Sequence, residues 1–319
     1  MAHSITSDPT SKTIARATVK MPGTCGELVQ GTLGGTPFHI SCPIDVYSTV
    51  TVELTAEAVR WTFPPDTPKA AAAVEAALRH FEVDGQGGRL SVRSSLPRAK
   101  GMASSTADVA GAINAVALAL GREISPAEVA QLALEIEPTD GSVFPDIVLF
   151  DHRGGELYEN LGPCPRIDLI VLDFGGEIDT VSFNSHDRTD LLRSIEPRIS
   201  EAVELVREGL RAGDPSLIGR GATISALANQ IVLFKPQLEV VLRLAQSLGA
   251  VGVDVGHSGT VIGVLVDPRH SDAMSIAPFF RLELPDVENV QVCRLVGGGC
   301  YWEEGRQALG VDEVCTELA

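Results

Sequence analysis

Alternating hydrophobic and polar residues predict several strands in the first hundred positions. Residues 46–52 place valines between tyrosine, serine and threonine, and residues 88–93 alternate in the same way. A period of two is typical of a strand with one buried face. Residues 15–20 also fit a strand. The five glycines of residues 21–35 favour a loop or hairpin instead, and residues 61–68 predict a proline-rich turn.

Helical patterns occur in both halves of the chain. Residues 69–80 and 107–120 are rich in alanine and contain no proline, which predicts two helices. Ser125-Pro126-Ala127-Glu128 has the form of a capping box with proline at the first helical position, so a helix should begin there and extend to about Glu135. The same pattern predicts strands over 167–174, 251–255, 260–266 and 290–296. It predicts helices over 187–212, 214–230 (with an interruption near Gly221) and 236–248. Residues 146–150 fit either a strand or a helix.

This mixture of strands and paired helices predicts an α+β protein. With 319 residues, the chain is long enough for two domains that each have a hydrophobic core. The sequence Pro163-Cys164-Pro165 is the best candidate for their boundary. We therefore expect one domain over residues 1–165, beginning with a loose tail at 1–14, and a second domain over 166–319.

Charge and cysteine content argue against some binding partners and some kinds of structural site. The formal net charge is −17, and a strongly acidic chain repels nucleic acid and anionic membrane surfaces. A nucleotide site would need local positive groups, a helix N-terminus or a metal ion to offset that field. The six cysteines form no Cys-x-x-Cys pair, so the sequence indicates reduced thiols and neither a zinc site nor a disulfide framework.

The terminal and apolar segments predict a cytoplasmic protein. Residues 1–18 are polar and do not resemble a secretory signal. The longest apolar helix candidate, residues 109–120, is too short to span a bilayer.

The stretch 97–108, Pro-Arg-Ala-Lys-Gly-Met-Ala-Ser-Ser-Thr-Ala-Asp, lies between a predicted strand and a predicted helix. Free backbone N–H groups at a helix start bind anions, and Gly101 lets the backbone approach a ligand closely. The hydroxyls of Ser104-Ser105-Thr106 could donate to phosphate oxygens or ligate a divalent cation. Arg98 and Lys100 add positive charge. A helix cap is the alternative interpretation, but a cap needs only one hydroxyl.

This stretch resembles the phosphate loop of the GHMP kinases, the superfamily of galactokinase and of homoserine, mevalonate and phosphomevalonate kinases. The signature Pro-x-x-x-Gly-x-x-Ser-Ser-x-Ala is filled by Pro97, Gly101, Ser104, Ser105 and Ala107, and Met102-Ala103 replaces the usual Leu-Gly. The resemblance implies an N-terminal domain like ribosomal protein S5 domain 2, a ferredoxin-like C-terminal domain, and the use of ATP and Mg²⁺. It assigns phosphate binding to Pro97, Lys100, Gly101, Met102, Ala103, Ser104, Ser105 and Thr106.

The amino-acid sequences of residues 100–108, 41–50 and 149–152 are similar to those of one branch of the family, the L-threonine kinases of cobalamin synthesis. The resemblance implies that Glu27, in a Pro-Gly and Gly-Glu motif, faces the substrate, and that Asp45 contacts it. A third motif over 254–260 implies a substrate contact for Ser258, whereas His257 fits a simple turn residue.

Residues 137–140, Glu-Pro-Thr-Asp, follow the loop by one helix, where GHMP kinases carry a metal-binding glutamate and an acceptor-side aspartate. The resemblance implies that Asp140 is catalytic and lies by the acceptor hydroxyl. The resemblance also implies that Glu137 and Ser105 bind Mg²⁺, with Glu135 as an alternative ligand. It implies a catalytic role for Ser105 as well. Asp140 could be a base or could only orient the hydroxyl, since phosphoryl transfer depends mainly on positioning and charge stabilisation.

The implied reaction is ATP + L-threonine → ADP + O-phospho-L-threonine, which serves the aminopropanol linker of cobalamin. Its partners are small molecules, with neither nucleic acid nor membrane, and a homodimer is compatible with it. One alternative is another GHMP small-molecule kinase, such as homoserine kinase. The other is a non-catalytic ligand-binding protein of the same fold, against which the intact hydroxyl loop and Asp140 argue.

Overall fold

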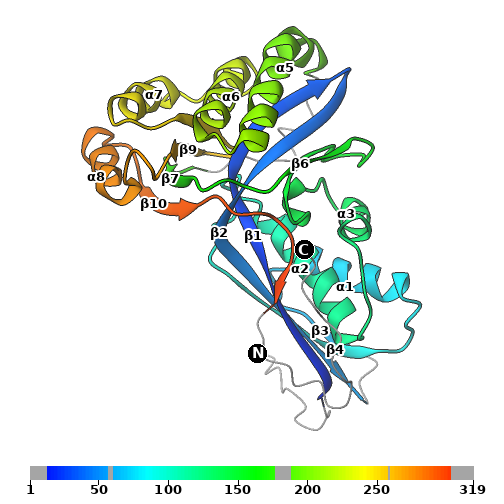
Figure 1. Cartoon of the computed structure of the whole chain (residues 1–319). Helices are drawn as coiled ribbons and strands as arrows, with labels where there is room; N and C mark the ends of the chain where they lie inside the picture. Colours follow the sequence, from blue (N-terminus) through cyan, green and yellow to red (C-terminus); the bar gives the residue numbers. More distant parts are fainter. Residues whose placement is uncertain (1–12, 57–59, 177–187, 258, 303–319) are drawn as a thin grey trace.

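The computed structural model describes residues 13–56, 60–176, 188–257 and 259–302. Its centre is an antiparallel hairpin of two long strands, β1 (Thr13–Leu33) and β2 (Thr36–Thr55), which extends through both halves of the molecule (Figure 1). Of the two interpretations of residues 21–35, the hairpin is confirmed, with Gly34 and Gly35 in its turn, and the loop is wrong for residues 21–33, which belong to β1. Register shifts around Gly23 and between Thr24 and Glu27 accommodate the glycines as irregularities within a strand.

The first half of the chain adds short strands and three helices to this hairpin. The strands are β3 (Trp61–Thr62), β4 (Gly87–Ser94), β5 (Ile147–Phe150) and β6 (Tyr158–Gly162), and the helices are α1 (Pro68–His80), α2 (Ser104–Ala119) and α3 (Pro126–Leu134). Helix α2 packs on β1 and β2, and α1 and α3 pack on α2. The capping box is confirmed, because Ser125 Oγ accepts from the Glu128 amide and the Glu128 carboxylate accepts from the Ser125 amide. Residues 61–62 form a strand and not the predicted turn.

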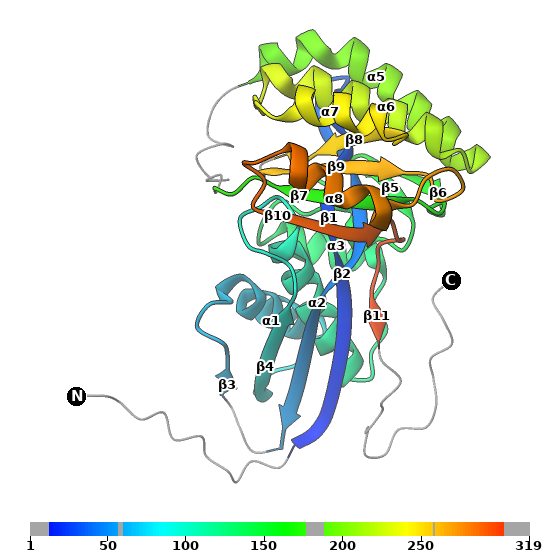
Figure 2. The same cartoon turned by 90° about the vertical axis from the view of Figure 1, so that its left-hand side faces the viewer.

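The second half places helices against the strands β7 (Asp168–Asp173), β8 (Gly252–Val255), β9 (Val261–Val266) and β10 (Asn289–Arg294) (Figure 2). The helices are α5 (Thr189–Ala212), α6 (Pro215–Ala228), α7 (Leu238–Ser247) and α8 (Ala273–Glu283), with a 3₁₀ turn η2 (Asn229–Ile231) after α6. Helix α8 was not predicted. The predicted interruption at Gly221 is wrong, because this glycine lets α5 and α6 pack closely: a Cβ there would lie 2.7 Å from the Ala202 carbonyl oxygen.

Among the described residues, one sheet of eleven strands connects the two halves. Its main order is β10-β7-β9-β8-β1-β2-β4-β3, with β11 (Tyr301–Trp302) on β1 and β5 on β2. The predicted boundary at 163–165 lies between β6 and β7, yet β1 pairs with β8 through Glu27 and Val255 across it. The larger hydrophobic core also contains side chains from both halves. None of the helices in the described part is long and apolar enough to cross a membrane.

Asp254 on β8 is a fully buried carboxyl group at this junction. Cys25 Sγ donates to its Oδ1 over 3.7 Å, and Cys42 and Glu27 are its other titratable neighbours. Burial raises the pKa of Asp254 to about 7, and hydrogen bonds from the thiols oppose this shift in part. The folded protein therefore holds a proton that the unfolded chain releases near pH 4.

This buried carboxyl group should make the protein less stable as the pH rises. Its contribution is complete below about pH 4 and is lost as the pH passes through about 7. We expect the melting temperature to fall between pH 5.5 and pH 8.5, and to fall less in an Asp254→Asn variant. Scanning calorimetry of both proteins checks this, because the effect of the net charge of −17 is nearly the same in each. Parallel pH curves would contradict it.

Candidate active site

The loop before α2 has a strained backbone that opens the helix start toward a pocket. Ala99, Gly101 and Ala103 all have positive φ angles, of 58°, 77° and 53°. The left-handed conformation is sterically unfavourable for alanine, and an alanine adopts it only where the surrounding structure imposes it. Ala103 is the N-cap residue of α2, and no side chain caps the helix there. The first N–H groups of α2 are thus left for a ligand.

Two backbone contacts from other elements hold this loop. The Thr24 amide on β1 donates to the Met102 carbonyl oxygen over 3.1 Å, and the Thr260 amide donates to that of Lys100 over 3.2 Å. A Cβ on Gly259 would lie 2.1 Å from the Lys100 oxygen. The phosphate loop therefore packs directly on the turn between β8 and β9, and only glycine fits at residue 259.

The loop forms one wall of a pocket of about 190 Å³. Most of the predicted site residues line it, including Glu27, Ser105, Glu137 and Asp140, so the structure brings together segments that are more than one hundred residues apart. The complete lining is Thr24, Glu27, His39, Lys69, Ala99, Gly101, Met102, Ala103, Ser104, Ser105, Thr106, Glu137, Pro138, Thr139, Asp140, His152 and His257.

Ser105, Glu137 and Lys69 form a hydrogen-bonded group in this pocket. Ser105 Oγ donates to Glu137 Oε1, and Lys69 Nζ donates to Glu137 Oε2. Sequence reasoning missed Lys69, although its place in the first turn of α1 was a signal. A cation is unfavourable at the positive end of a helix dipole unless a nearby anionic group pairs with it.

Asp140 lies beside the first turn of α2. Thr106 Oγ1 donates to Asp140 Oδ2 over 3.2 Å. The other carboxylate oxygen, Oδ1, lies 3.6 Å from His39 Nδ1. A single carboxylate therefore connects the hydroxyl residues of the phosphate loop to the histidine side of the pocket.

Glu27 is buried on β1 and faces the same histidine. Its Oε1 lies 3.7 Å from His39 Nδ1, and its Oε2 has no hydrogen-bond partner among the described residues. Burial, followed by the nearby charge of Asp140, raises the pKa of Glu27 well above its usual range. A cationic group bound between the two carboxylates would favour the ionised form.

Several predicted residues lie outside this pocket. Asp45 accepts from the Arg294 backbone and pairs with its guanidinium over 3.2 Å. Lys100 Nζ donates to Asp173 and to the Gly176 carbonyl oxygen, so its charge already has a partner. Pro97 and Glu135 do not line the pocket. Ser258 lies outside the described residues.

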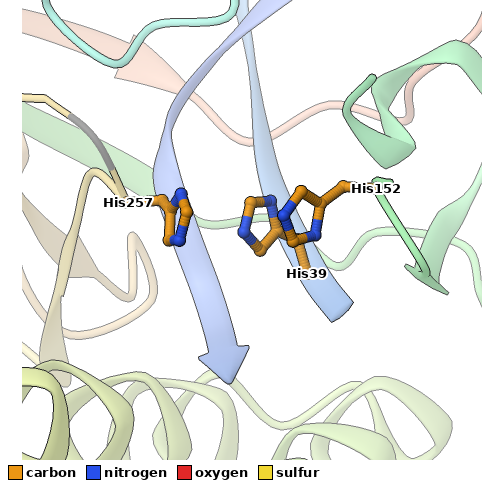
Figure 3. A group of neighbouring side chains, drawn as sticks. All are labelled: His39, His152 and His257. Carbon is orange, nitrogen blue, oxygen red and sulfur yellow. The ribbon is translucent and has the colours of Figure 1, made fainter. Parts of the chain in front are cut away.

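Three histidines that sequence reasoning did not combine form a cluster at the pocket, the histidine cluster (His39, His152 and His257; Figure 3). The rings of His39 and His152 stack with centroids 3.7 Å apart and planes 8° apart. The ring of His257 lies 4.5 Å from that of His39. Burial, aided by neighbouring positive groups, holds the pKa of His152 and of His257 well below the usual value, so both rings are neutral at pH 7.

The pocket offers two kinds of metal ligand. The hydroxyl of Ser105 and the carboxylate of Glu137 are hard oxygen donors of the type that Mg²⁺ prefers. One imidazole nitrogen from each residue of the histidine cluster lies within 4.8 Å of one nitrogen of each of the other two. However, an imidazole binds a metal in its ring plane, and two parallel stacked rings cannot direct lone pairs to one ion. The oxygen ligands are therefore the better candidate.

Comparison with known proteins identifies the family. Residues 68–148 match the model of the GHMP kinases N terminal domain, and residues 206–275 match that of the GHMP kinases C terminal domain. The fold is similar to that of a homoserine kinase from Cytophaga hutchinsonii, with a TM-score of 0.68, 18% identity, and coverage of 95% of this chain and 99% of that chain.

Sequence similarity is stronger to one branch. Over 259 residues the chain is 37% identical to the L-threonine kinase of Salmonella typhimurium, which covers 80% of this chain and 85% of that protein. It is 35% identical over 259 residues to the L-threonine kinase of Citrobacter freundii, covering 80% of this chain and 88% of that protein. The predicted α+β GHMP kinase fold is confirmed, and the chain belongs to the GHMP kinases, in the family of the L-threonine kinases.

Proposed function

We propose that the protein transfers the γ-phosphoryl group of ATP to the hydroxyl of L-threonine, and that ADP and O-phospho-L-threonine are released. The observation that carries this proposal is the place of Asp140, which lies within hydrogen-bond distance of Thr106 at the start of α2 and also faces the histidine cluster. A hydroxyl bound there would lie next to the phosphate loop. The similarity to L-threonine kinases supports threonine as the acceptor, and the role in making the aminopropanol linker of cobalamin is part of this proposal.

The phosphate loop binds the triphosphate in this proposal. The uncapped start of α2 provides backbone N–H groups, and Ser104, Ser105 and Thr106 provide hydroxyl donors. These local groups offset the repulsion from a chain with a net charge of −17. Lys69, 55% exposed at the side chain and already next to Glu137, adds a positive charge at the pocket wall.

Ser105 and Glu137 hold Mg²⁺ in this proposal, because their oxygens are adjacent and of the preferred type. When bound with ATP, Mg²⁺ neutralises charge on the phosphate oxygens. Asp140 orients the acceptor hydroxyl and takes up its proton as the new phosphorus–oxygen bond forms. A carboxylate oxygen of Glu27 lies within 4.8 Å of one of Asp140, so Glu27 can bind a positive group of the same acceptor.

A panel of acceptors in an ADP-release assay tests this function. Threonine should give a higher kcat/KM than serine, homoserine and mevalonate. Homoserine as the best acceptor would contradict the threonine assignment and leave the phosphotransfer intact. Binding of ATP and threonine without turnover would instead support the non-catalytic alternative.

A further inference from the structure

We infer that His152 binds the carboxylate of the acceptor through its Nδ1–H group while Glu27 binds the ammonium, so that the pocket selects α-amino acids. This inference rests on the proposed function and adds the groups that select its substrate. The ring of His152 stacks on that of His39, and in Figure 3 His39 lies between His152 and His257.

The tautomer of His152 follows from its neighbour. Arg153 Nε donates to His152 Nε2 over 3.3 Å, so Nε2 acts as the acceptor. The ring is neutral because burial lowers its pKa. A neutral imidazole carries one proton, and that proton must therefore be on Nδ1.

The Nδ1–H group of His152 is a donor without an acceptor. The residue is only 6% exposed and lines the pocket, and its Nδ1 atom is buried without a hydrogen-bond partner among the described residues. Buried donors are nearly always satisfied, by protein, water or ligand. A carboxylate oxygen is the strongest acceptor that a small substrate can offer, and the adjacent guanidinium of Arg153 adds favourable charge.

The surroundings of His152 are rigid. Its ring stacks on His39, and its carbonyl oxygen accepts from the Thr139 amide over 2.9 Å, next to Asp140. The following turn is fixed by the Asp151 carboxylate, which accepts from the amides of Arg153 and Gly154. The donor is thus held in place before a ligand arrives, which lowers the entropic cost of binding.

Groups that attract a cation lie near Nδ1 of His39. Glu27 Oε1 and Asp140 Oδ1 lie 3.7 and 3.6 Å from His39 Nδ1, and Glu27 Oε2 is a buried acceptor without a partner. The pocket therefore combines a donor, His152 Nδ1, with a carboxylate oxygen, Glu27 Oε2, and both lack a hydrogen-bond partner among the described residues. A zwitterion satisfies both, whereas a hydroxy acid without an amine leaves Glu27 unpaired.

Three acceptors with the same hydroxyl configuration separate these contacts. They are L-threonine, (R)-1-amino-2-propanol, which lacks the carboxylate, and (R)-3-hydroxybutyrate, which lacks the ammonium. His152→Phe keeps the stacked ring but removes the donor. It should lower kcat/KM for threonine by about 10²-fold and change kcat/KM for aminopropanol less than twofold. In calorimetric titrations with ADP present, His152→Phe should raise the Kd of threonine and leave the Kd of aminopropanol unchanged.

Matched variants complete the experiment. Glu27→Gln should reduce the preference for threonine over hydroxybutyrate by about 10-fold or more. His152→Gln keeps a side-chain N–H and should retain more of the discrimination than phenylalanine does. His270→Phe, at a histidine 73% exposed at the side chain and away from the pocket, should leave all three acceptors unchanged.

Two results would overturn the inference in different ways. Equal loss of threonine and aminopropanol turnover in His152→Phe, or no loss of either, would refute the carboxylate contact while the proposed kinase stands. A wild-type protein that turns over neither threonine nor its analogues would refute the proposed function itself.

Discussion

Replacing Asp140 with asparagine is expected to lower kcat for threonine phosphorylation by about 10²–10⁴-fold and to leave ATP binding at its wild-type strength. Asparagine keeps the shape of the side chain, and its carbonyl oxygen can still accept from Thr106 Oγ1. It cannot take up the proton that the acceptor hydroxyl loses. Single-turnover measurements of phosphotransfer, together with the Kd of an ATP analogue, check both parts of the expectation.

Asp146→Asn is the control for this experiment. Asp146 accepts from Asn160 over 2.9 Å, in the same segment as Asp140 but outside the pocket lining. Near-wild-type turnover by Asp140→Asn would rule out the base and leave only positioning. Loss of ATP binding would place Asp140 on the metal side and make Glu137 the candidate for the acceptor.

Ser105→Ala should lower kcat by about 10²-fold, a loss typical for one donor to a transition-state charge, and cause little loss of stability. Ser105 Oγ donates to Glu137 and does not cap α2. Without it, Glu137 loses its partner for Mg²⁺ and the phosphate loop loses a hydroxyl. The measurements are kcat as a function of Mg²⁺ concentration and the free energy of unfolding in urea.

Ser125→Ala provides the opposite pattern as a control. Ser125 is the true N-cap of α3, so its loss should cost about 1 kcal/mol of stability and leave kcat unchanged. A Ser105→Ala variant that is destabilised like Ser125→Ala but fully active would show that Ser105 has only a structural role.

Local features of the site were predictable from the sequence. The phosphate loop and the start of α2 lie within about ten residues, and their glycine and hydroxyl residues have direct conformational meaning. The capping box at Ser125 was predictable for the same reason. In each case the residues that determine the structure are neighbours in the chain.

The histidine cluster was not predictable, because strand pairing creates it. His39 is paired with Phe150 in the β2–β5 ladder, which places His152 two residues further on. Glu27 is paired with Val255 in the β1–β8 ladder, which places His257 two residues further on. Such registers depend on contacts across the whole chain, and a single sequence contains no local signal for them.

The same limit explains why the loop interpretation of residues 21–33 was wrong, whereas the hairpin interpretation was right. Five glycines favour a loop locally, but β2 satisfies their backbone hydrogen bonds along most of the segment. The substrate contact that the resemblance implies for Asp45 stays a prediction, and its observed partner, Arg294, lies 249 positions away. Neither pairing could be read from nearby residues.

The pairing of β11 with β1 has a consequence for synthesis of the protein. Val19 and Lys20 find their partners Trp302 and Tyr301 only after residues 21–300 have been synthesised. Until then this edge of β1 remains open, and open strand edges are templates for intermolecular association. A nascent chain stalled before residue 300 should therefore depend on chaperones more than a chain that includes β11 does.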